Sequence, residues 1–195
     1  MKLLLITLLI SQTLAHTPKH LGESRTFTVK SQTHDNIGTV KITQGHEGIV
    51  IRSNIKCLTS GGHGFHIHQK ATCLEATGFK SAGSHIGTVK TEEAREVACG
   101  YAVCKHGFFN RYGPHEGDLP NIFSNCDGDC DCGTQAEMYN HMLNLFSQNN
   151  EKSALLETGA AIVIHEHEDE HVDGLDGIGN SGKRFACVEI RATGE

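Results

Sequence analysis

Histidines at alternate positions are the first sign of chemistry in this chain. The string HGFHIH covers residues 63–68. On a β-strand, alternate side chains share one face, so His66 and His68 would lie side by side, with Phe65 and Ile67 opposite. On a helix the two imidazoles would point about 200° apart and could not share a ligand. The string therefore predicts either half of a metal site or a histidine-rich surface strand.

A second group of metal-ligating side chains lies in KHGFFNRYGPHEGDLPN, which holds His106, His115 and Asp118. Two imidazoles and one carboxylate form a normal ligand set for zinc, which takes four ligands in all. His85, in SAGSHIG, is a candidate for the fourth position. His165 ends the apolar run AAIVIH, and we expect it to point away from the isoleucines of that run.

Five motifs of the chain occur in the order typical of one enzyme family. They are GGHGFHIHQK, SAGSH, KHG followed by GPHEGDLPN, GAAIVIHEHED and GNSGKRFAC. On these motifs the chain resembles the copper/zinc superoxide dismutases, over residues 25–191. The resemblance implies conversion of two superoxide ions and two protons to oxygen and hydrogen peroxide. It also implies an all-β fold, an eight-stranded Greek-key β-barrel with two long functional loops, a metal-binding loop and an electrostatic loop.

The same resemblance implies two metal sites that share one histidine. Copper suits the redox step because it cycles between two oxidation states and accepts imidazoles in both, whereas zinc does not change state. Zinc on the second nitrogen of the shared ring would lower the cost of removing its second proton. By the resemblance, copper is bound by His66, His68, His85 and His165, and zinc by His85, His106, His115 and Asp118.

Other matching residues receive supporting roles from the resemblance. Arg184 would guide and hold superoxide, and together with the bridging histidine it forms the expected catalytic pair. Asp169 would accept hydrogen bonds from a copper-binding and a zinc-binding histidine and so fix their rings. Cys73 and Cys187 would form the disulfide that ties the metal-binding loop to the barrel. His63 matches a histidine that is structural rather than a ligand.

Short segments rich in β-branched residues must position these side chains. Their spacing, at about ten residues, is typical of a sandwich or barrel. Two long irregular stretches, 73–122 and 166–183, are expected to be functional loops. Residues 134–149 show both helical periodicity and alternation, and we expect a strand there. The other predicted strands cover residues 25–30, 38–43, 48–55, 64–68, 159–165 and 185–191.

The length, the net charge and the first fifteen residues limit the class of protein to which the chain can belong. A chain of 195 residues suits one domain, and a net charge of −6 argues against a cationic nucleic-acid binder. Residues 1–15 combine Lys2, a short apolar run and a small-residue end at Ala15, which predicts a signal peptide before a single domain at 16–195. The alternative is a buried N-terminal strand. No stretch reaches the roughly 20 apolar residues of a membrane span, so we expect a secreted, extracellular protein.

The eight cysteines fit an oxidising compartment. Insertions relative to the family are expected near 86–105 and 122–135. The first holds Cys99 and Cys104, which would close a small local loop. The second includes NCDGDCDC, residues 125–132. It predicts an acidic loop held by disulfides, one of them to Cys57; the alternative is an additional thiolate and carboxylate metal site.

The stretch 166–183 is unusually acidic for a loop expected to guide an anion. Its acids either oppose the positive field that steers superoxide or, for the most part, point into solvent, and we favour the second. His167 and His171 are expected to be solvated. The acids of this stretch are Glu166, Glu168, Asp169, Glu170, Asp173 and Asp176.

Two alternatives to a secreted copper/zinc superoxide dismutase remain open. One is a non-catalytic copper- and zinc-binding relative that sequesters or delivers metal, although such a protein would be expected to lose copper ligands or Arg184. The other is a copper-only enzyme, against which the intact set of zinc-binding residue types argues. Superoxide is the expected partner, and a homodimer is left open because no apolar patch stands out in the sequence.

Overall fold

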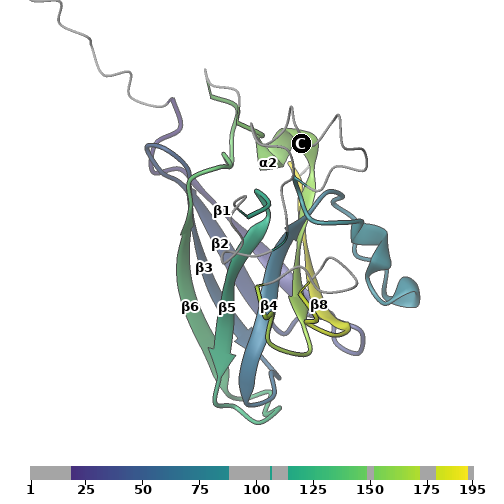
Figure 1. The fold of residues 1–195 in the computed structure, drawn as a ribbon. Helices are drawn as coiled ribbons and strands as arrows, with labels where there is room; N and C mark the ends of the chain where they lie inside the picture. Colours follow the sequence, from purple (N-terminus) through teal and green to yellow (C-terminus); the bar gives the residue numbers. More distant parts are fainter. Residues whose placement is uncertain (1–18, 88–105, 107–113, 149–151, 172–178, 193–195) are drawn as a thin grey trace, which may run out of the picture.

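Eight antiparallel strands form a nearly closed barrel in the computed structural model (Figure 1). The structure describes residues 19–87, 106, 114–148, 152–171 and 179–192. The strands are β1 Ser24–Ser31, β2 Gly38–Gln44, β3 Ile49–Lys56, β4 Gly61–His68, β5 Asp118–Ser124, β6 Gly133–Asn140, β7 Ala160–His165 and β8 Arg184–Ile190. The short helical elements are η1 Glu75–Thr77, η2 Lys80–Ala82 and α2 Leu155–Thr158.

The order of the strands around the barrel is β5-β4-β7-β8-β1-β2-β3-β6. Because β4 lies beside β7 and β3 beside β6, the chain crosses over between distant strands, which is the Greek-key pattern. The two end strands of this order, β5 and β6, also contact each other and nearly close the barrel. The all-β Greek-key barrel predicted from the sequence is confirmed.

Alternation along the strands fills the barrel interior. On β3, Ile49, Ile51 and Ile55 are fully buried, whereas Arg52 and Asn54 face solvent. A strand that alternates in this way packs one face on the core and leaves the other in water. Burying each isoleucine stabilises the fold by about 1.5–3 kcal/mol relative to an exposed side chain.

Strands β4 and β7 differ because both of their faces are buried. Phe65 and Ile67 of β4 belong to the barrel core, which leaves His66 and His68 on the outer face. A smaller cluster of buried side chains packs outside the barrel; it consists of Cys73, Phe79, Ala82, Ala161, Val163 and Cys187.

The segment that carries η1 and η2 lies outside the barrel wall (Figure 1). The structure joins Cys73 in this segment to Cys187 on β8, the pair that the resemblance implies. The backbone N–H of Cys73 also donates to the Glu189 carboxylate over 2.8 Å. One covalent and one polar tie therefore hold this segment against the outer face of the barrel.

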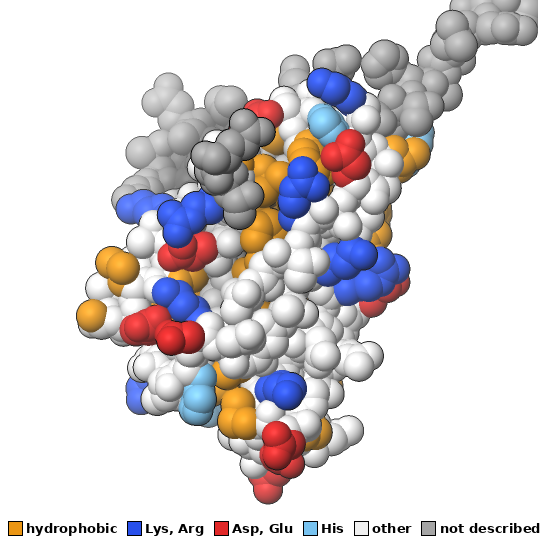
Figure 2. All heavy atoms as spheres, turned by 180° about the vertical axis from the view of Figure 1, so that it is seen from behind, with side chains coloured by type: hydrophobic (Ala, Val, Ile, Leu, Met, Phe, Trp, Pro, Cys, Tyr) orange, Lys and Arg blue, Asp and Glu red, His pale blue; other side chains and the backbone are white. Residues whose placement is uncertain are grey.

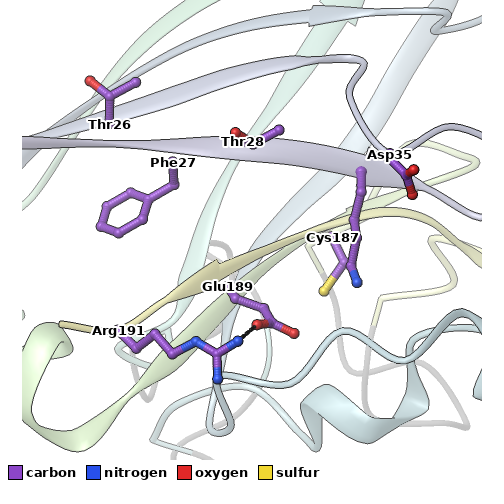
Figure 3. Close-up of a pocket in the computed structure, with 8 residues that line it drawn as sticks. Thr26, Phe27, Thr28, Asp35, Cys187, Glu189 and Arg191 are labelled. Atoms are coloured by element: carbon purple, nitrogen blue, oxygen red, sulfur yellow. Dashed lines mark hydrogen bonds and ion pairs between the residues drawn. The ribbon is translucent and has the colours of Figure 1, made fainter. Parts of the chain in front are cut away.

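β1 and β8 pair at one end only, through Lys30 with Cys187 and Ser31 with Ala186. Beyond these pairs the strands are no longer hydrogen-bonded to each other. Figure 3 shows the resulting pocket, of about 370 Å³, with Phe27 on the β1 side and the Glu189–Arg191 ion pair on the β8 side.

Strand β5 begins inside the stretch 73–122 that the sequence predicts to be irregular, so that prediction is wrong at its end. Pro120 obscures the strand in the sequence, because proline donates no hydrogen bond to a sheet. The structure accommodates it where the β4–β5 register shifts, between the His63–Ile122 and Phe65–Leu119 pairs. Bulges of this kind are where sheets tolerate proline.

Strand β6 covers only the first half of the predicted strand over 134–149. Asn140 ends it, because its side-chain Oδ1 accepts the N–H groups of Met142 and Leu143 and turns the chain. The short helix α2, which follows this turn, was not predicted from the sequence.

The acidic hairpin of residues 125–132 joins β5 to β6 and contains two disulfides. Cys126 pairs with Cys132 inside the hairpin, and Cys130 pairs with Cys57. The prediction that disulfides hold this loop, one of them to Cys57, is confirmed. The predicted Cys99–Cys104 pair lies outside the described residues.

The surface seen from behind carries both signs of charge. Figure 2 shows Lys and Arg side chains interspersed with Asp and Glu, without a large region of one sign on that face. Among the described residues, no helix is both long enough and apolar enough to cross a membrane.

Removing the Cys57–Cys130 bridge is expected to lower the free energy of unfolding by about 2–4 kcal/mol, because it closes a long loop in the unfolded chain. The bridge spans 73 residues, against 6 for Cys126–Cys132. The double variant Cys57→Ala/Cys130→Ala should therefore lose about 2 kcal/mol more than Cys126→Ala/Cys132→Ala in urea unfolding. Equal losses in the two variants would contradict this account.

Candidate metal centre

Four histidines converge on the outer face of the barrel. His66 and His68 come from β4, and His165 comes from the end of β7, beside β4. His85 joins them through an isolated bridge to His68. One nitrogen from each ring lies within 4.8 Å of the others, and all four residues are buried.

Hydrogen bonds on the far side of three rings fix which nitrogen faces the centre of the group. His66 Nε2 bonds to the Asp169 carboxylate over 2.7 Å, and His68 Nδ1 to a backbone carbonyl over 2.9 Å. His165 Nδ1 bonds to the Gly182 carbonyl over 3.3 Å. The remaining nitrogens are buried without a hydrogen-bond partner among the described residues: His66 Nδ1, His68 Nε2, His85 Nε2 and His165 Nε2.

Burial keeps these imidazoles neutral. It lowers the pKa of His68 and His165 well below the usual value, and the neighbouring histidines add to this effect. Burial, with the nearby His66, lowers the pKa of His85 to about 3. Burying four nitrogen lone pairs without a partner costs free energy unless a cation binds to them. The group therefore has the character of a metal site.

A second group surrounds Asp118, at the first position of β5. His85 Nδ1 lies 2.8 Å and His106 Nδ1 3.1 Å from Asp118 Oδ1. His115 Nδ1 lies 3.4 Å from Oδ2, which also accepts the His115 backbone N–H over 2.9 Å. Burial opposes the negative charge, but these imidazoles outweigh it and hold the pKa of Asp118 well below its usual range.

His85 belongs to both groups. Its Nδ1 faces Asp118, while its Nε2 lies on the side of His66. The ring centroids of His85 and His66 are 4.2 Å apart. The two sets of ligand atoms are therefore joined through a single imidazole ring. The sequence motifs implied this sharing, and the fold brings all seven residues together.

Asp169 contacts one histidine from each of the two groups. Its Oδ2 lies 2.7 Å from His66 Nε2 and 2.8 Å from His106 Nε2. Burial disfavours a cationic His106, but its bonds to Asp118 and Asp169 outweigh burial and raise the pKa of His106 to about 9. Burial alone would raise the pKa of Asp169. Its bonds to His106 and His66 outweigh burial and lower that pKa below its usual value.

Sequence reasoning missed two residues that position Asp169. Asn121 lies in the β4–β5 bulge and grips the backbone of Asp169: its Nδ2 donates to the carbonyl over 2.8 Å, and its Oδ1 accepts the N–H over 2.9 Å. Gly179 has a φ of +76°, and a Cβ there would lie 1.8 Å from Asp169 Oδ1 and 2.4 Å from His106 Nε2. Asn121 stands in the GDLPN motif, but its reach to Asp169 is visible only in the fold.

Arg184 lies at the start of β8, paired with His165 across the β7–β8 ladder. Its two terminal nitrogens donate to the carbonyls of Phe79 and Gly83, each over 2.8 Å. A pocket of about 880 Å³ opens here; it is lined by Gln32, Thr77, Gly78, Lys80, His165, Asn180, Gly182, Lys183 and Arg184. The cations Lys80, Lys183 and Arg184 thus surround an approach to His165, and no acid lines the pocket among the described residues.

Similarity to known proteins identifies the family of the chain. The family model for copper/zinc superoxide dismutase matches residues 36–190. The chain belongs to this family. The Cu-Zn superoxide dismutase of Caulobacter vibrioides is 33% identical over 168 residues, which are 86% of each protein. A second such protein, from Aquifex aeolicus, is 34% identical over 157 residues, 80% of this chain and 79% of that protein.

Two solved structures share the fold. The enzyme from Brucella abortus aligns with a TM-score of 0.60 at 25% identity, covering 86% of this chain and 99% of that chain. A mutant of the superoxide dismutase-like protein from Bacillus subtilis aligns with a TM-score of 0.69 at 27% identity, covering 86% and 97%. Family membership implies copper and zinc, and the two groups of ligand atoms fit that pair.

The histidines in and beside the stretch 166–183 have different environments. His63 is structural: Nδ1 bonds to the His165 carbonyl and Nε2 to the Thr59 carbonyl. His167 is exposed, as expected. The expectation that His171 is solvated is wrong, because its side chain is only 12% exposed and contacts Asp169. Asp173 and Asp176 lie outside the described residues.

Gly179→Ala is expected to weaken zinc retention about tenfold or more, because a Cβ would displace Asp169 and His106. Gly22→Ala is the matched control: its φ is +81°, yet a Cβ there would meet nothing within 4 Å. Zinc transfer to a chelator from the loaded variants measures the effect. Equal release from both variants would contradict the account that crowding of Asp169 and His106 disturbs the zinc group.

Proposed function

We propose that the protein is a secreted superoxide dismutase that uses copper and zinc. The observation that carries the proposal is the set of four buried imidazole nitrogens, joined through His85 to the group around Asp118, beside a pocket that contains Arg184. On this proposal His66, His68, His85 and His165 hold copper, and His85, His106, His115 and Asp118 hold zinc.

Copper would supply the one-electron redox change of the reaction, and zinc a fixed positive charge behind His85. The protein's own groups bind the substrate and handle protons. We assign proton transfer to His85 Nε2, because this buried atom has no hydrogen-bond partner among the described residues and lies in the same group as His165, which lines the pocket. Overall, two superoxide ions and two protons yield oxygen and hydrogen peroxide.

Arg184 is assigned to substrate binding. Burial lowers its pKa from the usual value, but a guanidinium stays protonated at neutral pH. Its bonds to two carbonyls hold the cation in place before the substrate arrives, so that little reorganisation accompanies binding of a small anion. Lys80 and Lys183 add positive charge around the same pocket and favour approach of an anion.

Secretion is proposed on two grounds. Residues 1–15 have the pattern of a cleaved leader, which leaves a single domain at 16–195. The three disulfides among the described residues are typical of a protein that folds in an oxidising compartment.

The loaded protein is expected to hold about one copper and one zinc per chain, as the two ligand groups require, and to consume superoxide. Arg184→Ala should lower this activity at least tenfold while copper content is unchanged, because the arginine holds substrate rather than metal. Arg191→Ala is the control, since Arg191 follows the far end of β8, pairs with Glu189 and lines a different pocket. A loaded protein without activity would favour the metal-sequestering alternative.

His85→Ala is expected to weaken zinc binding more than copper binding. The copper group keeps three imidazoles, whereas the zinc group is left with three ligands where zinc prefers four. Metal content after dialysis, measured for both ions, tests this expectation. Equal retention of the two metals in the variant would contradict a shared imidazole.

A further inference from the structure

His171 lies against Asp169, the carboxylate that links the two ligand groups. We infer that His171 is a positioning residue: together with Asn121 it fixes the Asp169 carboxylate, and through it the rings of His66 and His106. This role rests on the metal sites proposed above. It is assigned by contacts of the backbone and of both ring nitrogens.

The backbone of His171 makes the first contact. Its N–H donates to Asp169 Oδ1 over 2.8 Å. The φ of His171 is +52°, a left-handed conformation that few residues other than glycine adopt without cost. Such a conformation persists only where the surrounding structure stabilises it. Here it folds the chain back so that residue 171 faces the side chain of residue 169.

The imidazole ring makes the second and third contacts. Its Nδ1 lies 3.3 Å from Asp169 Oδ2, and its Nε2 lies 3.3 Å from Asn121 Nδ2. An amide nitrogen donates and does not accept, so Nε2 of His171 must be the acceptor in that contact. A neutral ring then carries its proton on Nδ1, which lies close to the carboxylate but outside hydrogen-bond geometry.

Asn121 connects this ring to the barrel. The same amide grips both backbone groups of Asp169 and also contacts His171. Because Asn121 belongs to β5, a chain of contacts runs from β5 through the ring to the carboxylate. The position of the carboxylate is therefore fixed relative to the barrel and not only relative to its own loop.

The consequence concerns the rings that bind metal. Asp169 Oδ2 lies 2.7 Å from His66 Nε2 and 2.8 Å from His106 Nε2. Without the backbone N–H of His171 and the ring that lies beside it, the carboxylate could turn with these rings instead of orienting them. Groups that orient metal ligands in this way typically contribute 10–100-fold to metal affinity.

The test uses the copper- and zinc-loaded protein and variants that separate the two ring nitrogens. His171→Asn keeps a polar group near the position of Nδ1 and suits the left-handed backbone. His171→Gln keeps one near the position of Nε2 only, and His171→Phe keeps neither. His167→Phe is the control, since His167 is exposed in the same loop. The readouts are the rate of zinc transfer to a chelator and the visible absorption of bound copper(II).

We expect His171→Phe and His171→Gln to release zinc about tenfold faster and to shift the copper absorption, while His171→Asn and His167→Phe stay within about threefold of the unmodified protein. If the Asn and Gln variants release zinc at the same rate, the inference is overturned. If His171→Phe does not fold, the comparison of Asn with Gln still decides. Neither readout uses superoxide, so this test can fail while the activity test succeeds, and the reverse.

Discussion

A buried carboxylate held between imidazoles is the interaction on which this metal centre depends. Asp169 contacts His66 from a barrel strand and His106, which is 63 residues away in the sequence. Asp118 contacts His85 and His106. Away from water, such charge-assisted contacts are strong, and an unpaired partner would be costly. The two carboxylates therefore fix ring orientations before any metal binds.

The barrel supplies the rigidity that these contacts require. Alternation on β4 sends Phe65 and Ile67 into the core and His66 and His68 outward, so that the same pleat that stabilises the fold also aims two ligands. Sites built on strands are held more firmly than sites on loops. The Cys73–Cys187 bridge then holds the covering segment, with His85 at its end, against this face.

Close packing at glycines is the complement of these polar contacts. Gly179 lets Asp169 and His106 meet, and a Cβ at Gly64 would lie 2.8 Å from the Ser181 side chain and 3.1 Å from the His66 ring. The centre is therefore crowded behind the ligands and open at the pocket of Arg184. Among the described residues, cations line this opening, which favours the approach of a small anion there.

The sequence by itself predicted alternating strands, groups of metal-ligating histidines and the disulfide loop, because each leaves a local mark: alternation, histidine spacing or clustered cysteines. The closed Greek-key barrel and the full set of metal-binding residues were predicted only through the resemblance to the family. It did not reveal β5, whose proline sits in a bulge, or the end of β6, where Asn140 turns the chain. The tertiary structure alone decided the roles of Asn121 and His171. Asn121 acts on Asp169 from 48 residues away, and such a distant contact leaves no periodic trace in the chain. His171 is only two residues from Asp169, but the left-handed turn that brings it to the carboxylate is visible only in the fold.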